Sequence, residues 1–462
     1  MASGLVRTLR IRTRRKHGNL GILTTALGDA GTTIGEIITV KFGHSFTLRD
    51  FNLVLDNEEH LKNVVDAIGA LADSEVVEVK NAVQNVHRGG KVRTCARASM
   101  DTLTDLQTSL TPGVSEVVNL IDKEPELALR LTAVQRTVAI ISDGSGLRGV
   151  GRVRSQAVLP VLEAKAAWLS ARGGLNTLPI GLDVQSEDEF IAAVKALRPS
   201  CGMLLVDAMA GGRAVRVCKR LTEALDIPVF HDDSDAPAVA GLAAVINACQ
   251  KIGRNPADVQ IGQIGLGTAG GAIAELLMRY TGRPVYGEDV HPAGISRHVA
   301  LGGKSASMEE IMATCDIVLA NTGHGDVIPK EMVREGQAIL ALSEPHPEIE
   351  PYDAIMAGAA FAADGRAMNK AVVLPGVMLG ALAVRATRVT DEMKIAAALT
   401  LASQAVETDL LPTPLDVSIH AEVATAVAKA ALESGVGQIA DKNLLRPETF
   451  IEISEDRRQL PL

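Results

Sequence analysis

The first stretch of the chain alternates apolar and charged residues. In LVRTLRIRTR, residues 5–14, apolar side chains recur at about every second position, which is the period of a β-strand with one solvated face. We therefore predict an edge strand here. The same basic residues would also suit a targeting peptide or a basic arm, but no apolar segment of the kind that a signal peptide needs follows them.

A small domain can be predicted from the pattern that follows. After a break at Gly18 the chain becomes helical, and the segments 35–43 and 47–57 have the alternation of a hairpin. Residues 58–71 form an amphipathic helical pattern and residues 74–83 a closing strand. The predicted order is βαββαβ, which many unrelated small domains share.

Beyond about residue 85, strands alternate with helices, and this pattern predicts a parallel α/β fold. Short apolar runs occur in TVAIISD, LPIGLDV, GMLLVDA and IPVFHDD, and the last three end close to an acid. Ligands of open α/β sheets gather at the carboxyl ends of the strands, so Asp207, Asp232 and Asp233 are expected to converge there. Such oxygen ligands suit Mg²⁺ or Mn²⁺. Capping of the next helix is the alternative role for each acid.

A glycine-rich turn marks a second α/β sheet. Gly265, Gly267 and Gly270 form a GxGxxG motif, with Thr268 and Ala269 inside it, between a predicted strand and a predicted helix. Asp289 ends the next strand, where dinucleotide folds place the acid that binds the ribose 2′-hydroxyl. This arrangement predicts dinucleotide binding and favours NAD over NADP. The strands DIVLANTG and AILALSEP extend the same sheet.

Composition limits the classes of function. The 462 residues are 47% hydrophobic, enough for about three domains at the usual ~150 residues each. A net charge of −9 and an aromatic content of 2% disfavour nucleic-acid binding. Five scattered cysteines without a CxxC pair indicate neither disulfides nor a zinc site, and no apolar run reaches membrane-spanning length. We expect a cytoplasmic protein.

Six blocks of sequence follow one another within about residues 86–435: TPGVSEVVNLI, VLPVLEAKAAWL, LDIPVFHDD, GLGTAGGAIAELL, HPEIEPYDA and VLPGVMLGALAVRATRVTDEMKIAAA. In sequence and in order, these blocks resemble those of the malic enzymes. The preceding βαββαβ pattern resembles the ACT family of small-ligand regulatory domains; a purely structural or dimerising module is the alternative. The resemblance implies an α/β protein with an ACT-like domain (1–84), a substrate and metal domain (85–240) and a Rossmann-type domain with C-terminal helices (241–462).

The resemblance also implies roles for single residues. Malic enzymes oxidise malate with NAD(P), and a divalent metal polarises the keto acid while CO₂ leaves. The family's general base matches Lys165, and its metal carboxylates match Asp207 and Asp233, with Asp232 alongside. Two family positions are occupied by residues that cannot take the same role: Leu110 stands where the family has its proton-donating tyrosine, and Val206 stands where it has one of its metal-binding carboxylates. We therefore expect weakened metal binding and an impaired protonation step.

Other predicted pocket positions have changed as well. The two substrate asparagines of the family match Glu344 and Lys370, the latter beside Asn369, and a loop of the substrate domain brings in Arg148 and Arg152. These changes predict a hydroxy acid other than malate. The alternative is a catalytically silent relative that acts as a regulatory subunit. Either protein would be a homodimer or a larger homo-oligomer, with a small-molecule effector at the ACT-like domain and no nucleic-acid or membrane partner.

Overall fold

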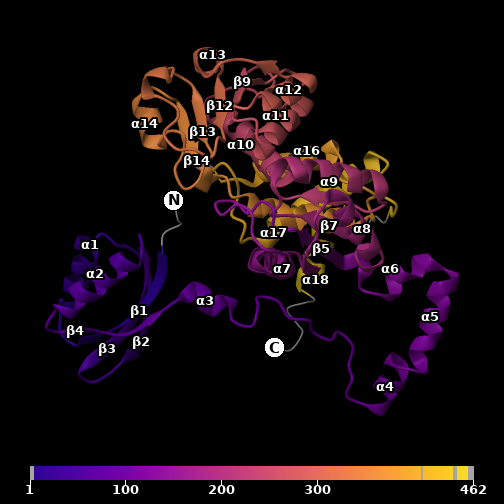
Figure 1. Ribbon diagram of the computed structural model, residues 1–462, viewed down its shortest axis with the longest axis horizontal. Coiled ribbons are helices and arrows are strands. Elements are labelled where there is room, and N and C mark those ends of the chain that lie inside the picture. The colour runs from indigo at the N-terminus through magenta and orange to yellow at the C-terminus, as the bar shows by residue number, and fades with distance from the viewer. Residues whose placement is uncertain (1–4, 407–408, 441–444, 456–462) are drawn as a thin grey trace. The chain divides into compact units, whose positions relative to one another are not determined.

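The computed structural model describes residues 5–406, 409–440 and 445–455 (Figure 1). The chain divides into two compact units, Met1–Arg93 and Thr94–Leu462. Each unit contains its own sheet or sheets and its own hydrophobic core.

The first unit has the predicted βαββαβ order. Its elements are β1 (Leu5–Arg14), α1 (Asn19–Asp29), β2 (Thr33–Phe42), β3 (Phe46–Leu55), α2 (Glu58–Gly69) and β4 (Ser74–Lys80), followed by the short helix α3 (Ala82–His87). Helices α1 and α2 cover one face of the sheet (Figure 1), where Leu23 and Val64 pack against Leu9 and Phe51. The predicted hairpin is the antiparallel pair β2 and β3.

The prediction of an edge strand at residues 5–14 is wrong. The antiparallel sheet has the order β2-β3-β1-β4, so β1 lies in its interior. Its basic side chains meet acids on both neighbouring strands: Arg10 Nε lies 2.7 Å from Asp50 Oδ1 on β3, and Arg10 Nη1 lies 3.5 Å from Glu78 Oε2 on β4. Charge pairing across the sheet therefore allows a strongly basic strand to lie at a central position.

The second unit begins with short helices and then forms a parallel sheet. The helices are α4 (Leu103–Ser109), α5 (Gly113–Lys123) and α6 (Ala128–Leu131). The sheet has the order β6-β5-β7-β8, from strands β5 (Thr137–Ser142), β6 (Asn176–Gly181), β7 (Met203–Val206) and β8 (Val229–His231). Helices α7 (Leu159–Gly173), α8 (Glu187–Leu197) and α9 (Gly211–Ala224) connect the strands. The four apolar runs in the sequence form these four strands, as predicted. Strands β5 and β7 are buried along their whole length.

A long helix joins this sheet to a second parallel sheet. This helix is α10 (Asp235–Lys251), which is buried from Ala236 to Cys249. The second sheet has the order β11-β10-β9-β12-β13-β14. Its strands are β9 (Ile261–Ile264), β10 (Tyr286–Glu288), β11 (Lys304–Ser305), β12 (Ile317–Ala320), β13 (Ala338–Ala341) and β14 (Phe361–Asp364). Helices α11 (Thr268–Thr281), α12 (Pro292–Ala300), α13 (Met308–Thr314) and α14 (Pro351–Met356) connect them, giving the Rossmann-type arrangement that the sequence predicts.

The C-terminal helices return to the first parallel sheet. They are α15 (Val373–Ala383), α16 (Asp391–Gln404), α17 (Val417–Glu433) and α18 (Pro447–Glu455), and α15, α17 and α18 pack against α7. Helix α15 is buried from Val373 to Leu382 but has only 11 residues. Across the described ranges, no helix combines the length and apolarity required to cross a membrane. The predicted boundary at residue 240 falls inside α10 and stays a prediction.

Candidate functional site

Three carboxylates meet where two strands of the first parallel sheet end. Asp207 directly follows β7, and Asp232 and Asp233 directly follow β8. One oxygen of each lies within 4.8 Å of the others. Asp207 and Asp232 are buried and Asp233 is half-buried. The convergence predicted from the sequence is therefore present.

Lys165 reaches this group from helix α7. Its Nζ donates to Asp232 Oδ2 at 2.5 Å and lies 2.7 Å from Asp207 Oδ2. The predicted general base is thus ion-paired with two of the three predicted metal ligands.

A second lysine lies on the same carboxylates. Lys370 Nζ donates to Asp232 Oδ2 at 2.7 Å and to Asp233 Oδ1 at 3.1 Å. We call Lys165, Asp207, Asp232, Asp233 and Lys370 the lysine–aspartate cluster. The sequence identified Lys370 as an altered pocket residue but did not predict its pairing with these acids.

Helix α7 also positions Lys370. Trp168 lies one turn after Lys165 on α7, and its indole Nε1 donates to the backbone oxygen of Ala371 at 2.9 Å. The Asn369 side chain accepts from the Ala371 N–H at 3.0 Å and so caps the short 3₁₀ turn Lys370–Val372. Asn369, predicted to line the pocket, is exposed and acts in this structure as a cap.

Burial and charge shift the pKa values of the cluster. Burial alone would lower the pKa of Lys165, but the charges of Asp232 and Asp207 outweigh it and raise that pKa above its usual value. Burial would raise the pKa of Asp232, but the two ammonium groups outweigh it and lower that pKa to about 2. Burial dominates at Asp207 and raises its pKa. At neutral pH, Lys165 and Asp232 are therefore charged.

The carboxylates alone have the spacing that a divalent metal needs. Mg²⁺ and Mn²⁺ require several oxygen ligands in close contact. Here the ammonium groups of Lys165 and Lys370 already bond Asp232, Lys370 also bonds Asp233, and Val206 has no oxygen on its side chain. With Lys370 in this position, the donor set does not fit a resident divalent cation.

Two other polar residues, His231 and Asp235, lie beside the cluster at the two ends of the turn between β8 and α10. Asp235 Oδ2 accepts from the backbone N–H of His231 at 2.8 Å, and its Oδ1 lies 3.0 Å from Lys394 Nζ on α16. His231 is buried, and burial lowers its pKa. Asp235 is the first residue of α10 and bonds the turn before the helix; the N-cap, Ser234, makes no side-chain cap hydrogen bond.

The glycine loop has the geometry of a dinucleotide cradle. Gly265 has φ of +88°, and a Cβ there would lie 2.5 Å from the Asn321 carbonyl oxygen. A Cβ on Gly270 would lie 2.0 Å from the Gly265 carbonyl oxygen, whereas one on Gly267 would meet nothing within 4 Å. Gly265 and Gly270 thus have no space for a side chain, whereas Gly267 has open space around it. Helix α11 starts directly after Gly267, with Thr268 and Ala269 as its first two residues. The loop fits a pyrophosphate bound at a helix N-terminus.

Asp289 lies against this loop. Its Oδ2 accepts from the Leu266 N–H at 2.7 Å, and its Oδ1 accepts from the His291 N–H at 2.7 Å. Arg297 Nη2 donates to the Leu266 carbonyl oxygen at 2.7 Å. Asp289 and Arg297 therefore bind the N–H and the carbonyl oxygen of the same residue, Leu266, which lies in the glycine loop.

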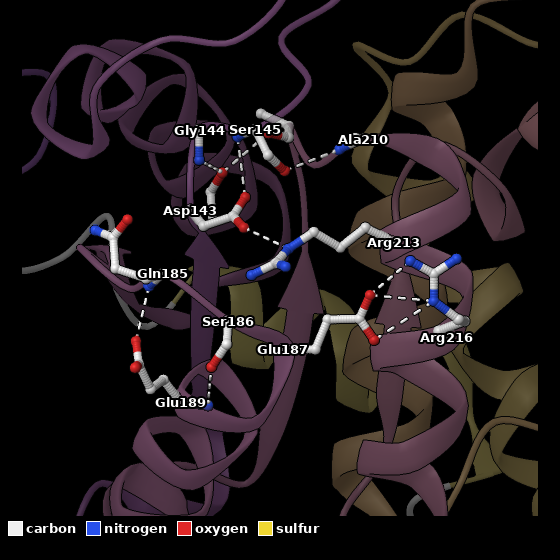
Figure 2. Close-up of polar contacts among 12 residues, drawn as sticks. Asp143, Gly144, Ser145, Gln185, Ser186, Glu187, Glu189, Ala210, Arg213 and Arg216 are labelled. Atoms are coloured by element: carbon white, nitrogen blue, oxygen red, sulfur yellow. Dashed lines mark hydrogen bonds and ion pairs between the residues drawn. The ribbon is translucent and has the colours of Figure 1, made fainter.

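The loop after β5 is tied to helix α9. Figure 2 shows Asp143 accepting from the Ser145 N–H at 2.9 Å and from Arg213 Nε at 2.8 Å. The Ser145 hydroxyl accepts from the Ala210 N–H at 3.1 Å. Arg148 and Arg152 lie farther along this loop and are exposed. The structure places them at the same edge of the sheet as the cluster but gives no contact with it among the described interactions.

Two other predicted pocket residues lie outside the cluster. Leu110 follows α4 and is 54% exposed, and its backbone bonds are local. Glu344 follows β13 and is exposed. The buried acid of that region is Glu348, which the sequence did not single out: its Oε1 accepts from the Thr322 N–H at 2.7 Å and from the Ser343 hydroxyl at 2.5 Å. Glu348 differs from Glu344 in its burial and in these hydrogen bonds, and the sequence pattern shows neither.

Comparisons with known proteins place this chain among relatives of one family. A family model described as malic enzyme, NAD binding domain, matches residues 332–432. The NAD-dependent malic enzyme 1 of Bacillus subtilis (strain 168) is 41% identical over 434 residues, or 94% of this chain and 99% of that protein. The NAD-dependent malic enzyme of Geobacillus stearothermophilus is 30% identical, over 93% and 95% of the two chains. The crystal structure of malic enzyme from Pyrococcus horikoshii Ot3 has a TM-score of 0.75 and 30% identity, covering 80% of this chain and 93% of that one.

Proposed function

The chain belongs to the malic enzyme family, and from that premise we propose that it oxidises a 2-hydroxy acid with NAD at the lysine–aspartate cluster. It is a dehydrogenase of the malic-enzyme type. The observation that supports the location most directly is the pairing of Lys165 with Asp207 and Asp232 at the carboxyl edge of the first parallel sheet.

NAD fits the glycine loop of the second parallel sheet. Gly267 leaves room for the pyrophosphate, the N-terminus of α11 offers backbone donors, and Asp289 offers carboxylate oxygens to the ribose. Bound NAD supplies the acceptor for the hydride that leaves C2 of the hydroxy acid. No arginine adjoins Asp289 in the sequence, and this supports NAD over NADP.

Lys165 is the proposed proton-transfer residue. Its raised pKa keeps it protonated at rest, so it can donate a proton to the 2-oxygen of a keto acid in the reductive direction. In the oxidative direction it accepts the hydroxyl proton as it passes one of its own protons to Asp207 Oδ2, 2.7 Å from its Nζ, where burial raises the pKa of the carboxyl group. Asp207 and Asp232 hold its Nζ in place for either direction.

The substrate class follows from the charges near the cluster. Lys370 presents a half-buried ammonium group, which can pair with a carboxylate or with the 2-oxygen of a hydroxy acid. Leu110, Val206, Glu344 and Lys370 differ from the family residues, and this supports an acid other than malate as the preferred substrate. Because Leu110 cannot carry a proton, we propose that oxidation is faster than any decarboxylation.

Loss of the family's proton donor at Leu110 and of a metal carboxylate at Val206 is what a catalytically silent regulatory subunit would also show. Such a protein has no requirement to keep Lys165 and three carboxylates together, and in this structure they form one bonded group.

The experiment is a screen of 2-hydroxy acids, including malate, for NADH formation at 340 nm, with CO₂ release measured in parallel. We expect turnover with at least one acid, NADH exceeding CO₂, and loss of turnover in Lys165→Ala with NAD binding retained. Absence of NADH with every acid would contradict the proposal. Malate as the best substrate would contradict only the changed preference.

A further inference from the structure

We propose that the ammonium group of Lys370 takes the place of a divalent metal, so that the lysine–aspartate cluster works without one. The inference rests on the proposed function for its catalytic part, because that function defines the oxygen on which the cation acts. Its structural part, exclusion of the metal by Lys370, stands on the cluster alone.

The first observation is the position of the ammonium group. Lys370 Nζ bridges Asp232 Oδ2 at 2.7 Å and Asp233 Oδ1 at 3.1 Å, and it lies 3.5 Å from the Asp232 backbone oxygen. These are oxygens of the group that has metal-binding spacing. A cation bound to the same two carboxylates would occupy the space of the ammonium group.

The second observation is the charge of the cluster. Asp207, Asp232 and Asp233 contribute three negative charges when ionised, and Lys165 and Lys370 contribute two positive ones. One further carboxylate of the family's metal site is missing, because Val206 stands there. The site has thus gained a positive charge and lost a negative one, and both changes oppose a divalent cation.

The third observation is that Lys370 is held in place. Its 3₁₀ turn is capped by the Asn369 side chain, and the neighbouring Ala371 carbonyl accepts from the Trp168 indole at 2.9 Å. Trp168 and Lys165 lie on the same helix. Helix α7 thus carries Lys165 and, through the Trp168 hydrogen bond, holds the turn that carries Lys370, as a preorganised site requires.

The chemistry that this assigns to Lys370 is electrostatic. As hydride leaves C2, the hydroxyl oxygen becomes a carbonyl oxygen; its proton passes to Lys165, which passes one of its own protons to Asp207 Oδ2, 2.7 Å away. Lys370 keeps its own protons and donates a hydrogen bond to that oxygen or to the adjacent carboxylate, where it stabilises negative charge. No bond to Lys370 forms or breaks.

The test measures Mn²⁺ binding directly, without substrate, by electron paramagnetic resonance of free Mn²⁺ with the full chain. The variants are Lys370→Asn, which has the residue that the family resemblance implies, Lys370→Met, which removes the charge, and Lys370→Arg, which keeps it. Circular dichroism confirms that each variant is folded. We expect wild type and Lys370→Arg to bind Mn²⁺ ~10-fold or more weakly than Lys370→Asn and Lys370→Met.

Equal Mn²⁺ affinity of wild type and Lys370→Asn would overturn the inference, and so would failure of all four proteins to bind. For the catalytic part, wild-type NADH formation should be unchanged by EDTA, whereas Lys370→Asn should lose activity in EDTA and regain part of it with Mn²⁺. Inhibition of wild type by EDTA overturns this part. If no hydroxy acid is oxidised, the proposed function fails, but the Mn²⁺ comparison still decides whether Lys370 excludes the metal.

Discussion

Lys165 and Lys370 bond the same oxygen atom, Oδ2 of Asp232, at 2.5 and 2.7 Å. Lys165 lies on helix α7, which connects two strands of the first parallel sheet, and Lys370 lies in the segment between β14 and α15. Asp232 is fully buried, and its other oxygen, Oδ1, has no hydrogen-bond partner among the described residues. This carboxylate is therefore the residue that joins the two halves of the site.

Removal of that carboxylate should destabilise the protein. In Asp232→Ala, the ammonium groups of Lys165 and Lys370 lose their shared partner, and each keeps one other carboxylate, Asp207 or Asp233. We expect a loss of ~3 kcal/mol, the lower end for buried pairs that lose one member, because neither ammonium group is left unpaired. Asp233→Ala is the matched control, since Asp233 is half-buried and pairs with Lys370 alone. Thermal unfolding checks this; equal melting temperatures for the two variants would show that Asp232 has no special role.

Trp168 should affect catalysis through the position of Lys370. Trp168→Phe keeps an aromatic ring but removes the N–H that binds the Ala371 carbonyl. A single neutral hydrogen bond contributes about 0.5–1.5 kcal/mol, so we expect a ~2- to 10-fold lower kcat. NAD affinity should stay unchanged, because Trp168 is on the substrate side. A changed NAD affinity with unchanged kcat would refute this positioning role.

Asp289 should control both the loop and the choice of cofactor. Asp289→Ala removes the acceptor for the Leu266 and His291 N–H groups and the carboxylate offered to the ribose. We expect weaker NAD binding and a smaller preference for NAD over NADP. Asp289→Asn removes the charge but keeps one of the two acceptors, because its single amide oxygen can replace only one carboxylate oxygen. Titration calorimetry with NAD and NADP measures both affinities. An unchanged preference for NAD over NADP in both variants would exclude Asp289 from cofactor selection.

The first unit should lose stability in acid through Asp50. The hydrogen bonds from Arg10 lower the pKa of Asp50, against the effect of burial. A carboxyl group whose pKa is lower in the folded state stabilises the protein above its unfolded pKa of about 3.9, and this contribution disappears as pH falls through the folded pKa. Hydrogen exchange of residues 5–14 should therefore differ between wild type and Asp50→Asn at pH 6. This difference in hydrogen exchange should shrink below pH ~4, where Asp50 becomes protonated in the wild type. A difference that grows in acid would contradict a lowered pKa of Asp50 in the folded protein.

Much of the fold could be predicted from the sequence because burial leaves a pattern in it. The continuous apolar runs that end near Asp207 and Asp232 are buried parallel strands, and the position of these acids at the strand ends brought them together. The glycine motif was equally informative, since Gly265 and Gly270 have no space for a side chain.

What the sequence could not show depends on contacts between distant segments. Whether β1 is an edge or a central strand depends on Asp50 and Glu78 on its two neighbours, and the alternation within β1 is the same in either case. Likewise, Lys370 looked like one altered pocket residue among several. Its contact with Asp232 depends on how α15 returns to α7, which no local pattern encodes.

The most direct test of the central claim, hydride transfer from C2 of a hydroxy acid at the lysine–aspartate cluster, is the fate of deuterium at C2. The best substrate of the screen is prepared with deuterium at that position, and the NADH is analysed by mass spectrometry for wild type and Lys165→Ala. The account predicts deuterated NADH from wild type, with a slower rate than for the unlabelled acid, and none from Lys165→Ala. Unlabelled NADH from wild type, or equal rates of labelled NADH from both proteins, would contradict it.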